Sequence, residues 1–117
     1  MTRDELLDYC LAKPGAWSDE PWEGDVVAKV GSKVFAFLGS GGTVGVKCGK
    51  DRTVADEWLQ RYPGDARASA YIGRYGWNTL RVGGKIPTGE IREAIDSSYD
   101  DVVSRLPRRE RPQPKVS

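Results

Sequence analysis

Histidine is absent from this chain of 117 residues, and only two cysteines are present. Imidazole is the side chain best suited to proton transfer near neutral pH, and it is a common metal ligand, so the usual residue for both chemistries is missing. Cys10 and Cys48 lack a Cys-x-x-Cys spacing, and each stands where an apolar residue would serve. We therefore expect two buried free thiols rather than a disulfide or a metal site, in a reducing cytoplasm.

Long apolar runs and catalytic signatures are also missing. No stretch approaches the roughly 20 apolar residues that span a bilayer, and the acidic start of the chain does not resemble a secretory signal. No Gly-x-Ser-x-Gly, Walker or dinucleotide-binding motif occurs, and the glycine-rich residues 39–42 lack the Lys-Ser/Thr pair and the following helix of a phosphate loop. We expect a protein that is not an enzyme and that carries no cofactor and no metal.

The length suits one domain, because a compact fold of this size buries roughly two thirds of the surface that its unfolded chain exposes. We assign residues 1–106 to a single domain. Residues 107–117 are basic and contain Pro112 and Pro114, which predicts a flexible tail.

Local patterns predict a helix and a meander of strands in the first half of the chain. Thr2 and Glu5 have the spacing of a capping box, so a helix is expected to begin at residue 3. Residues 26–30 and 33–38 are predicted strands joined by the two-residue turn Gly31-Ser32, and residues 43–48 form a third. The polar residues 19–25 are expected to be loop.

The second half is predicted to contain two helices and one further strand. A helix is expected from Thr53 to the Pro63-Gly64 stop, followed by an irregular segment over residues 65–76 and a strand over 77–82. Apolar residues then repeat at three- and four-residue steps from Ile91 to Leu106, which indicates an amphipathic helix. The fold class is therefore α+β, with a single antiparallel β-sheet, helices packed on one face and the other face toward solvent.

Charge is unevenly distributed along the chain. Residues 29–85 carry ten basic side chains against four acidic ones, whereas the segments of the first and last helices are acidic. Strand alternation turns Lys29, Lys47 and Arg81 away from the helices, together with Trp77. Lys33, Phe35 and Phe37 alternate along one strand and share one side of it. Because Lys33 is easily solvated, we expect this side to face away from the helices, so that Phe35 and Phe37 are at least partly exposed.

Cations interleaved with aromatic rings suit a nucleic-acid surface, since cations neutralise phosphates and rings stack on bases. Two other interpretations stay open. Lysines on an open sheet face also serve solubility and block edge pairing, and aromatic residues there pair across strands. Alternatively, the exposed rings form a patch for a protein partner or a small ligand; the rings in question are Trp17, Trp22, Phe35, Phe37 and Trp77.

Several short blocks, in order, resemble the MmcQ/YjbR family of small bacterial proteins. They are Lys13-Pro14-Gly15-Ala16, Pro21-Trp22, the hairpin Lys29-Val30-Gly31-Ser32-Lys33-Val34-Phe35-Ala36, Val46-Lys47-Cys48, Tyr62-Pro63-Gly64, Trp77-Asn78-Thr79, Ile86-Pro87 and Ser98-Tyr99-Asp100-Asp101-Val102-Val103. The resemblance covers roughly residues 3–106.

The resemblance implies a fold similar to the frataxin-like CyaY proteins and a role in DNA binding through a proposed double-wing arrangement. The family usually has a basic residue and a histidine just before the tryptophan; here Arg74 supplies the cation, and Gly76 stands where the histidine is expected. By analogy with frataxin, metal handling through Asp4, Glu5 and Asp8 is a third interpretation. Our leading hypothesis is a monomer that binds DNA or another nucleic acid weakly, through Lys29, Lys33, Lys47, Arg74, Tyr75, Trp77 and Arg81.

Overall fold

The computed structural model describes residues 1–39 and 41–112. It contains one six-stranded antiparallel sheet with the strand order β1-β2-β3-β4-β6-β5. The strands are β1 (Ala16–Trp22), β2 (Asp25–Val30), β3 (Lys33–Leu38), β4 (Thr43–Lys47), β5 (Ala66–Ala68) and β6 (Trp77–Arg81). The predicted α+β class with a single antiparallel sheet is confirmed.

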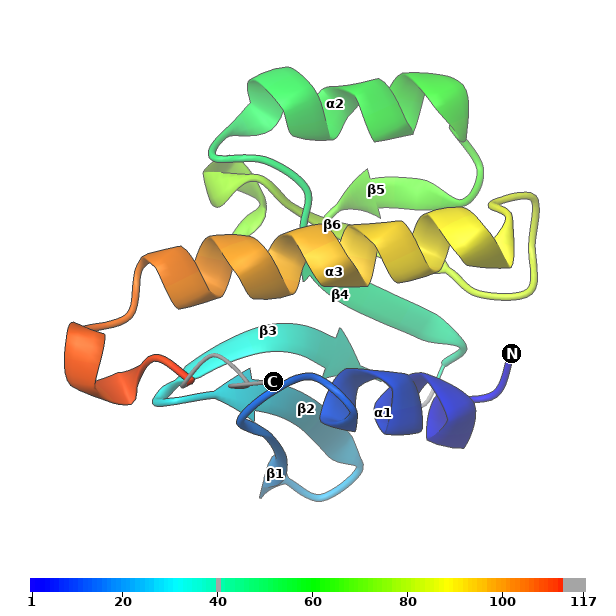
Figure 1. Cartoon of the computed structure of the whole chain (residues 1–117). Coiled ribbons are helices and arrows are strands. Elements are labelled where there is room, and N and C mark those ends of the chain that lie inside the picture. Colours follow the sequence, from blue (N-terminus) through cyan, green and yellow to red (C-terminus); the bar gives the residue numbers. More distant parts are fainter. Residues whose placement is uncertain (40, 113–117) are drawn as a thin grey trace.

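Three helices lie on the same face of this sheet (Figure 1). They are α1 (Arg3–Leu11), α2 (Arg52–Arg61) and α3 (Thr88–Ser104), and two short 3-10 helices, η1 (Gly73–Tyr75) and η2 (Arg108–Glu110), complete the elements. The predicted capping box is present: the amide of Glu5 donates to the Thr2 hydroxyl, and the Thr2 amide donates to the Glu5 carboxylate. Two otherwise unpaired amides of the first turn are thereby satisfied.

The core lies between the sheet and the helices, and each fully buried aliphatic or aromatic side chain stabilises it by roughly 1.5–3 kcal/mol. Residues from every layer contribute, among them Leu6, Cys10, Val30, Leu38, Val44, Val46, Leu80, Ile91, Ile95 and Val102. Strand parity was predicted correctly for Val44 and Val46 of β4 and for Leu80 of β6, which face the helices. We call the opposite side of the sheet the outer face.

Phe35 corrects the predicted parity of β3. Ala28 pairs with Ala36 and Lys29 with Val34, so Phe35 is an extra residue in a β-bulge. A bulge rotates the following side chains relative to simple alternation, and the ring of Phe35 therefore enters the core. It is fully buried and meets the ring of Tyr99 edge-on at 5.2 Å. The prediction that Phe35 is exposed is wrong.

Two strands were not predicted. The segment expected to be loop over residues 19–25 contains most of β1, which pairs with β2 as an edge strand and carries an irregularity between Asp19 and Trp22. Ser, Asp, Glu and Pro have low strand propensity, and only pairing with β2 holds this segment extended. The irregular segment 65–76 contains β5, which is three residues long, and η1.

The segment predicted as a flexible tail begins with ordered contacts. Glu110, in η2, accepts a hydrogen bond of 2.8 Å from the amide of Ser32, and Arg111 donates to the carbonyl groups of Ser104 and Leu106. Residues 113–117 lie outside the described residues.

Both cysteines are free; Cys10 is buried and Cys48 is half-buried. Burial raises the pKa of Cys10 to about 12 and that of Cys48 to about 11. The fraction of Cys48 that is present as the reactive thiolate near neutral pH is therefore roughly a hundredfold lower than for an ordinary cysteine. We expect both thiols to react slowly with an aromatic disulfide reagent at about pH 8 and at full rate in urea. Fast reaction in the native protein would contradict this.

Candidate functional site

The register of the strands defines which side chains share the outer face. Thr43 lies opposite Arg81, Lys47 opposite Trp77, and Arg67 opposite Thr79. Directly opposed residues of antiparallel strands project to the same side. Arg81 and Trp77 are therefore on the outer face, and Arg67 joins them from β5. Lys47, at the end of β4, instead lines a pocket with residues of α2 and α3, so its predicted outward position is wrong.

Lys29 is on the outer face but is not a free cation. Its Nζ lies 3.5 Å from Oδ2 of Asp19 and 4.7 Å from the centre of the Trp17 ring. Both partners come from β1, the strand that was not predicted. A carboxylate and an aromatic face beside the ammonium group already satisfy the charge that was expected to meet a phosphate.

Lys47 differs from its predicted role more strongly. The residue is only 8% exposed, and its Nζ donates a hydrogen bond of 2.7 Å to the carbonyl oxygen of Tyr75. Burial lowers the pKa of this lysine, since desolvation disfavours the charged form. The ammonium group therefore anchors the segment before β6 instead of facing solvent.

Arg52 holds the same segment from the start of α2. Its guanidinium donates to the carbonyl oxygens of Gly73 at 3.0 Å and Trp77 at 3.1 Å, and it also binds the carboxylate of Asp56. We call residues 69–76, which connect β5 to β6, the β5–β6 loop. Two cations thus fix its backbone at the edge of the outer face.

The tip of the β5–β6 loop is strained. The amide of Ile72 donates to the carbonyl of Ala70 at 2.7 Å, and Tyr71 between them has φ +66°. A three-residue turn with positive φ at its centre is rare, and a bulky aromatic residue in that conformation costs roughly 1–3 kcal/mol. The side chain of Tyr71 is 98% exposed. The strained conformation is therefore not offset by packing of the Tyr71 side chain, and its effect is to hold an aromatic ring in solvent.

The other residues of the loop also present cations and rings. The guanidinium of Arg74 lies over the Tyr75 ring at 4.8 Å from its centre, and both side chains are exposed. Trp77, at the start of β6, is half-buried and meets Phe37 edge-on at 5.5 Å. Arg74 and Tyr75 therefore remain available to a ligand, whereas Trp77 is partly used in packing.

Lys33 stands apart from this group. It is exposed at the start of β3, which is two strands removed from β6. Its strand partner is Val30, whose side chain is in the core, so the prediction that Lys33 shares the outer face is wrong. Of the seven residues predicted as a site, the structure gathers Arg74, Tyr75, Trp77 and Arg81 around β6. Lys29 and Lys47 are engaged within the protein.

Gly76 explains why the expected histidine is missing. Its φ is +88°, and a Cβ atom built at this position would overlap the carbonyl oxygen of Gly49. The Gly76 carbonyl accepts from the amide of Cys48 at 2.7 Å, which keeps the two segments this close. No side chain fits here without a backbone shift, so an imidazole has no place in this loop.

Sequence reasoning missed Arg52, Arg67 and Tyr71. Arg67 was assigned to irregular structure because a three-residue strand has no visible alternation. Tyr71 lies in a stretch of small residues, and only its positive φ identifies it as unusual.

Metal and membrane features are not found in the part of the chain that the structure describes. Its acidic and cysteine side chains form no group of three or more that could hold a metal ion, and this includes Asp4, Glu5 and Asp8. None of its helices combines the length and the apolar character that a membrane crossing needs.

Comparisons with known proteins identify relatives along most of the chain. The family model of YjbR matches residues 11–101. The YjbR proteins of Escherichia coli K12 and of Escherichia coli O157:H7 are each 31% identical to this chain over 113 residues, 95% of this chain and 95% of each relative.

Two crystal structures show the same fold at low sequence identity. A Deinococcus radiodurans protein with a DUF419 domain has a TM-score of 0.81 and 21% identity, covering 93% of this chain and 84% of its own. A Pseudomonas syringae protein has a TM-score of 0.64 and 19% identity, covering 84% of this chain and 96% of its own. At these identities the likeness concerns the fold alone.

Proposed function

The chain belongs to the YjbR family, and from this starting point we propose that it is a nucleic-acid-binding protein without catalytic activity. The observation that carries the proposal is the β5–β6 loop, where a strained turn holds the Tyr71 ring in solvent and the same loop also exposes Arg74 and Tyr75. Strained residues persist where the surrounding structure enforces them, and they concentrate at functional sites.

The exposed rings favour single strands over duplex. Unpaired bases can stack on Tyr71 and Tyr75, and such stacking contributes roughly 1–3 kcal/mol per base. In a duplex the bases are already stacked on one another and the rings have no access to their faces. Arg74, before the start of β6, and Arg81, at its far end, would contact the backbone, and β6 between them is about 14 Å long.

The first test removes the exposed ring. In Tyr71→Ala, affinity for a fluorescent single-stranded oligonucleotide is expected to fall about tenfold at low salt, because one stacked base is lost. Tyr71→Phe is the matched control, since it keeps the aromatic face and is expected to bind like the native protein. Fluorescence anisotropy measures both. The side chain is almost fully exposed, so neither change should alter stability through lost packing.

Salt dependence provides the second readout of the same titration. With Arg74 and Arg81 each neutralising one phosphate, the log–log slope of affinity against salt concentration is expected to be about −1.4 for a single strand. Affinity that is weaker than millimolar at low salt, or equal for Tyr71→Ala and Tyr71→Phe, argues against the proposal.

The proposal also includes a cellular location and an oligomeric state. Two free thiols suit a reducing compartment, so we place the protein in the cytoplasm, acting as a monomer.

A second candidate function rests on an apolar groove beside β1. Trp22 is 72% exposed, and with Phe37 and Val27 it lines a groove of about 310 Å³. Such a groove fits an apolar side chain of a protein partner or a small apolar ligand. If the groove binds a protein partner, the complex with that partner survives nuclease treatment and is lost in Trp22→Ala. The affinity of this variant for an oligonucleotide is then unchanged. If nucleic acid is the ligand, nuclease treatment disperses the complex.

A further inference from the structure

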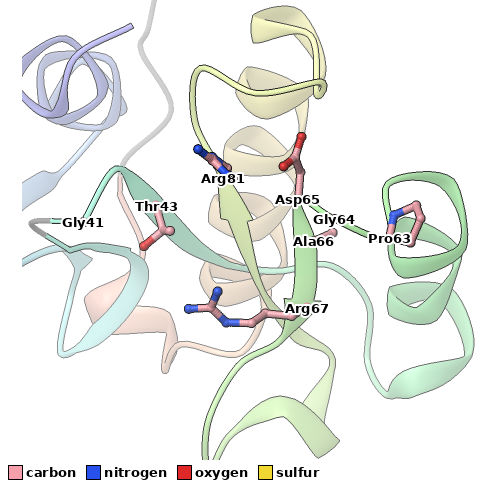
Figure 2. A pocket seen from close by; sticks show the side chains of 8 residues that line it. All are labelled: Gly41, Thr43, Pro63, Gly64, Asp65, Ala66, Arg67 and Arg81. Atoms are coloured by element: carbon pink, nitrogen blue, oxygen red, sulfur yellow. The ribbon is translucent and has the colours of Figure 1, made fainter.

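A pocket of about 350 Å³ opens on the outer face between the ends of β4, β5 and β6 (Figure 2). Its lining includes Thr43 from β4, Arg67 from β5 and Arg81 from β6. Arg81 lies opposite Thr43 and diagonal to Arg67 across the β5–β6 pair. Diagonal neighbours on one face are within reach of long side chains, and Figure 2 shows both guanidinium groups extending toward the side of Thr43.

The two arginines line one pocket, and their charges are not paired with a carboxylate in the described residues. Within residues 1–39 and 41–112, neither guanidinium has a carboxylate oxygen within 4.0 Å, whereas Lys13, Lys29, Arg52, Arg61 and Arg105 each do. Two like charges on adjacent strands repel one another and destabilise the pair. An anion bound between them would remove this repulsion and accept hydrogen bonds from both planar groups.

Asp65 also lines the pocket, but its carboxylate is already engaged. Oδ2 accepts a hydrogen bond of 2.6 Å from the amide of Lys85, in the turn that follows β6. Figure 2 shows the carboxylate pointing away from Arg67. Asp65 therefore closes one rim of the pocket and leaves the space between the arginines and Thr43 to the ligand.

A smaller hollow of about 210 Å³ adjoins the pocket, and Thr43 lines both. Its lining includes Phe37, Ile72 and Gly45, and the side chain of Phe37 lies against Gly45. A charged pocket beside a hollow with an aromatic wall suits a ligand that carries a phosphate next to a planar ring.

We propose that this pocket binds the terminal phosphate of a nucleic-acid strand, with the last base in the adjoining hollow; the inference rests on the proposed function. A terminal phosphate presents up to two negative charges and three acceptor oxygens, while an internal phosphodiester has one charge. Two arginine forks and one hydroxyl match three oxygens better than they match a diester.

The test compares three versions of one oligonucleotide with an internal fluorophore: 5′-phosphorylated, 3′-phosphorylated and with neither phosphate. One phosphorylated version is expected to bind about ten- to hundredfold more tightly than the unphosphorylated strand. Arg67→Gln and Arg81→Gln are each expected to bring this ratio close to one. Arg92→Gln, on α3, removes a cation from the helical face and should leave the ratio unchanged.

Two further variants separate the pocket from the loop. Asp65→Asn keeps an acceptor for the Lys85 amide and removes a negative charge, so the preference for the phosphorylated end is expected to rise. Tyr71→Ala weakens all three versions alike and leaves the ratio intact.

The outcomes distinguish the inference from the function on which it rests. Equal binding of the three oligonucleotides by the native protein overturns terminal-phosphate recognition and leaves nucleic-acid binding standing. Absence of binding to every strand overturns the proposed function. Tight binding of a nucleoside monophosphate or of inorganic phosphate, with none to strands, shows that the pocket serves a small ligand and overturns the inference as well.

Discussion

Replacing Gly76 by alanine is expected to destabilise the protein by about 3–5 kcal/mol. Gly76 has φ +88°, where a Cβ atom is strained, and that atom would also overlap the carbonyl oxygen of Gly49. Because the obstructing atom belongs to the backbone, relief requires separating the β5–β6 loop from the end of β4. The hydrogen bond from the Cys48 amide to the Gly76 carbonyl would then be lost. Urea unfolding measures the effect.

Gly83→Ala provides the matched control. Gly83 has φ +83°, almost the same as Gly76, but no atom lies within 4 Å of the place that a Cβ atom would occupy there. Its substitution carries the conformational cost alone, roughly 1–2 kcal/mol. Equal destabilisation by the two variants would mean that the contact with Gly49 relaxes freely. In that event, the account of why no histidine fits this loop is wrong.

Replacing Ser98 by alanine is expected to cost about 2–4 kcal/mol, because two buried backbone groups lose their partners. The Ser98 hydroxyl accepts a hydrogen bond of 2.9 Å from the amide of Lys47 and donates one of 2.7 Å to the carbonyl of Phe35. The bulge at Phe35 and the end of β4 at Lys47 leave these groups outside the sheet ladder. A single side chain of α3 satisfies both.

Ser97→Ala is the control for the helix itself. Ser97 precedes Ser98 on α3 and is exposed, so its change should remain within about 0.5 kcal/mol. Thermal or urea unfolding of the two variants separates the bridging hydrogen bonds from helix propensity. A Ser98→Ala variant as stable as Ser97→Ala would show that water replaces the hydroxyl.

Ser98 and its neighbours give physical meaning to blocks that carried the family resemblance. In the block from Ser98 to Val103, Ser98 bridges two strands and Tyr99 packs edge-on against Phe35. The Lys47 of the Val46-Lys47-Cys48 block anchors the β5–β6 loop through Tyr75. Part of the shared pattern therefore maintains the fold, and the loop residues are the better candidates for binding.

The elements that sequence reasoning located correctly depend on short-range chemistry. The capping box at Thr2 and Glu5 and the hairpin turn at Gly31-Ser32 involve residues at most three positions apart. The repeat from Ile91 to Leu106 predicts α3 because one helical face must be apolar wherever the helix packs. Local rules suffice in each case.

The candidate site was less predictable, because the availability of a charged side chain depends on distant residues. The ammonium group of Lys29 contacts Asp19 and Trp17, which lie on β1, a strand whose residues have low strand propensity. The ammonium group of Lys47 donates a hydrogen bond to a carbonyl oxygen 28 residues away. Strand alternation contains no information on such partners. Arg67 and Arg81 were equivalent to other cations in the composition. The fold distinguishes them by bringing both into one pocket on the outer face, where neither forms an ion pair in the described residues.

From its residues alone, this chain could be assigned an antiparallel sheet backed by amphipathic helices and a basic middle segment. Periodicity and turn chemistry act within a few residues, so they are legible without coordinates. Folding alone selected which cations face solvent without a partner, which aromatic ring entered the core and which tyrosine was held at positive φ. Those outcomes arise from pairings between segments far apart in the chain, where a bulge or one hydrogen bond outweighs the local pattern.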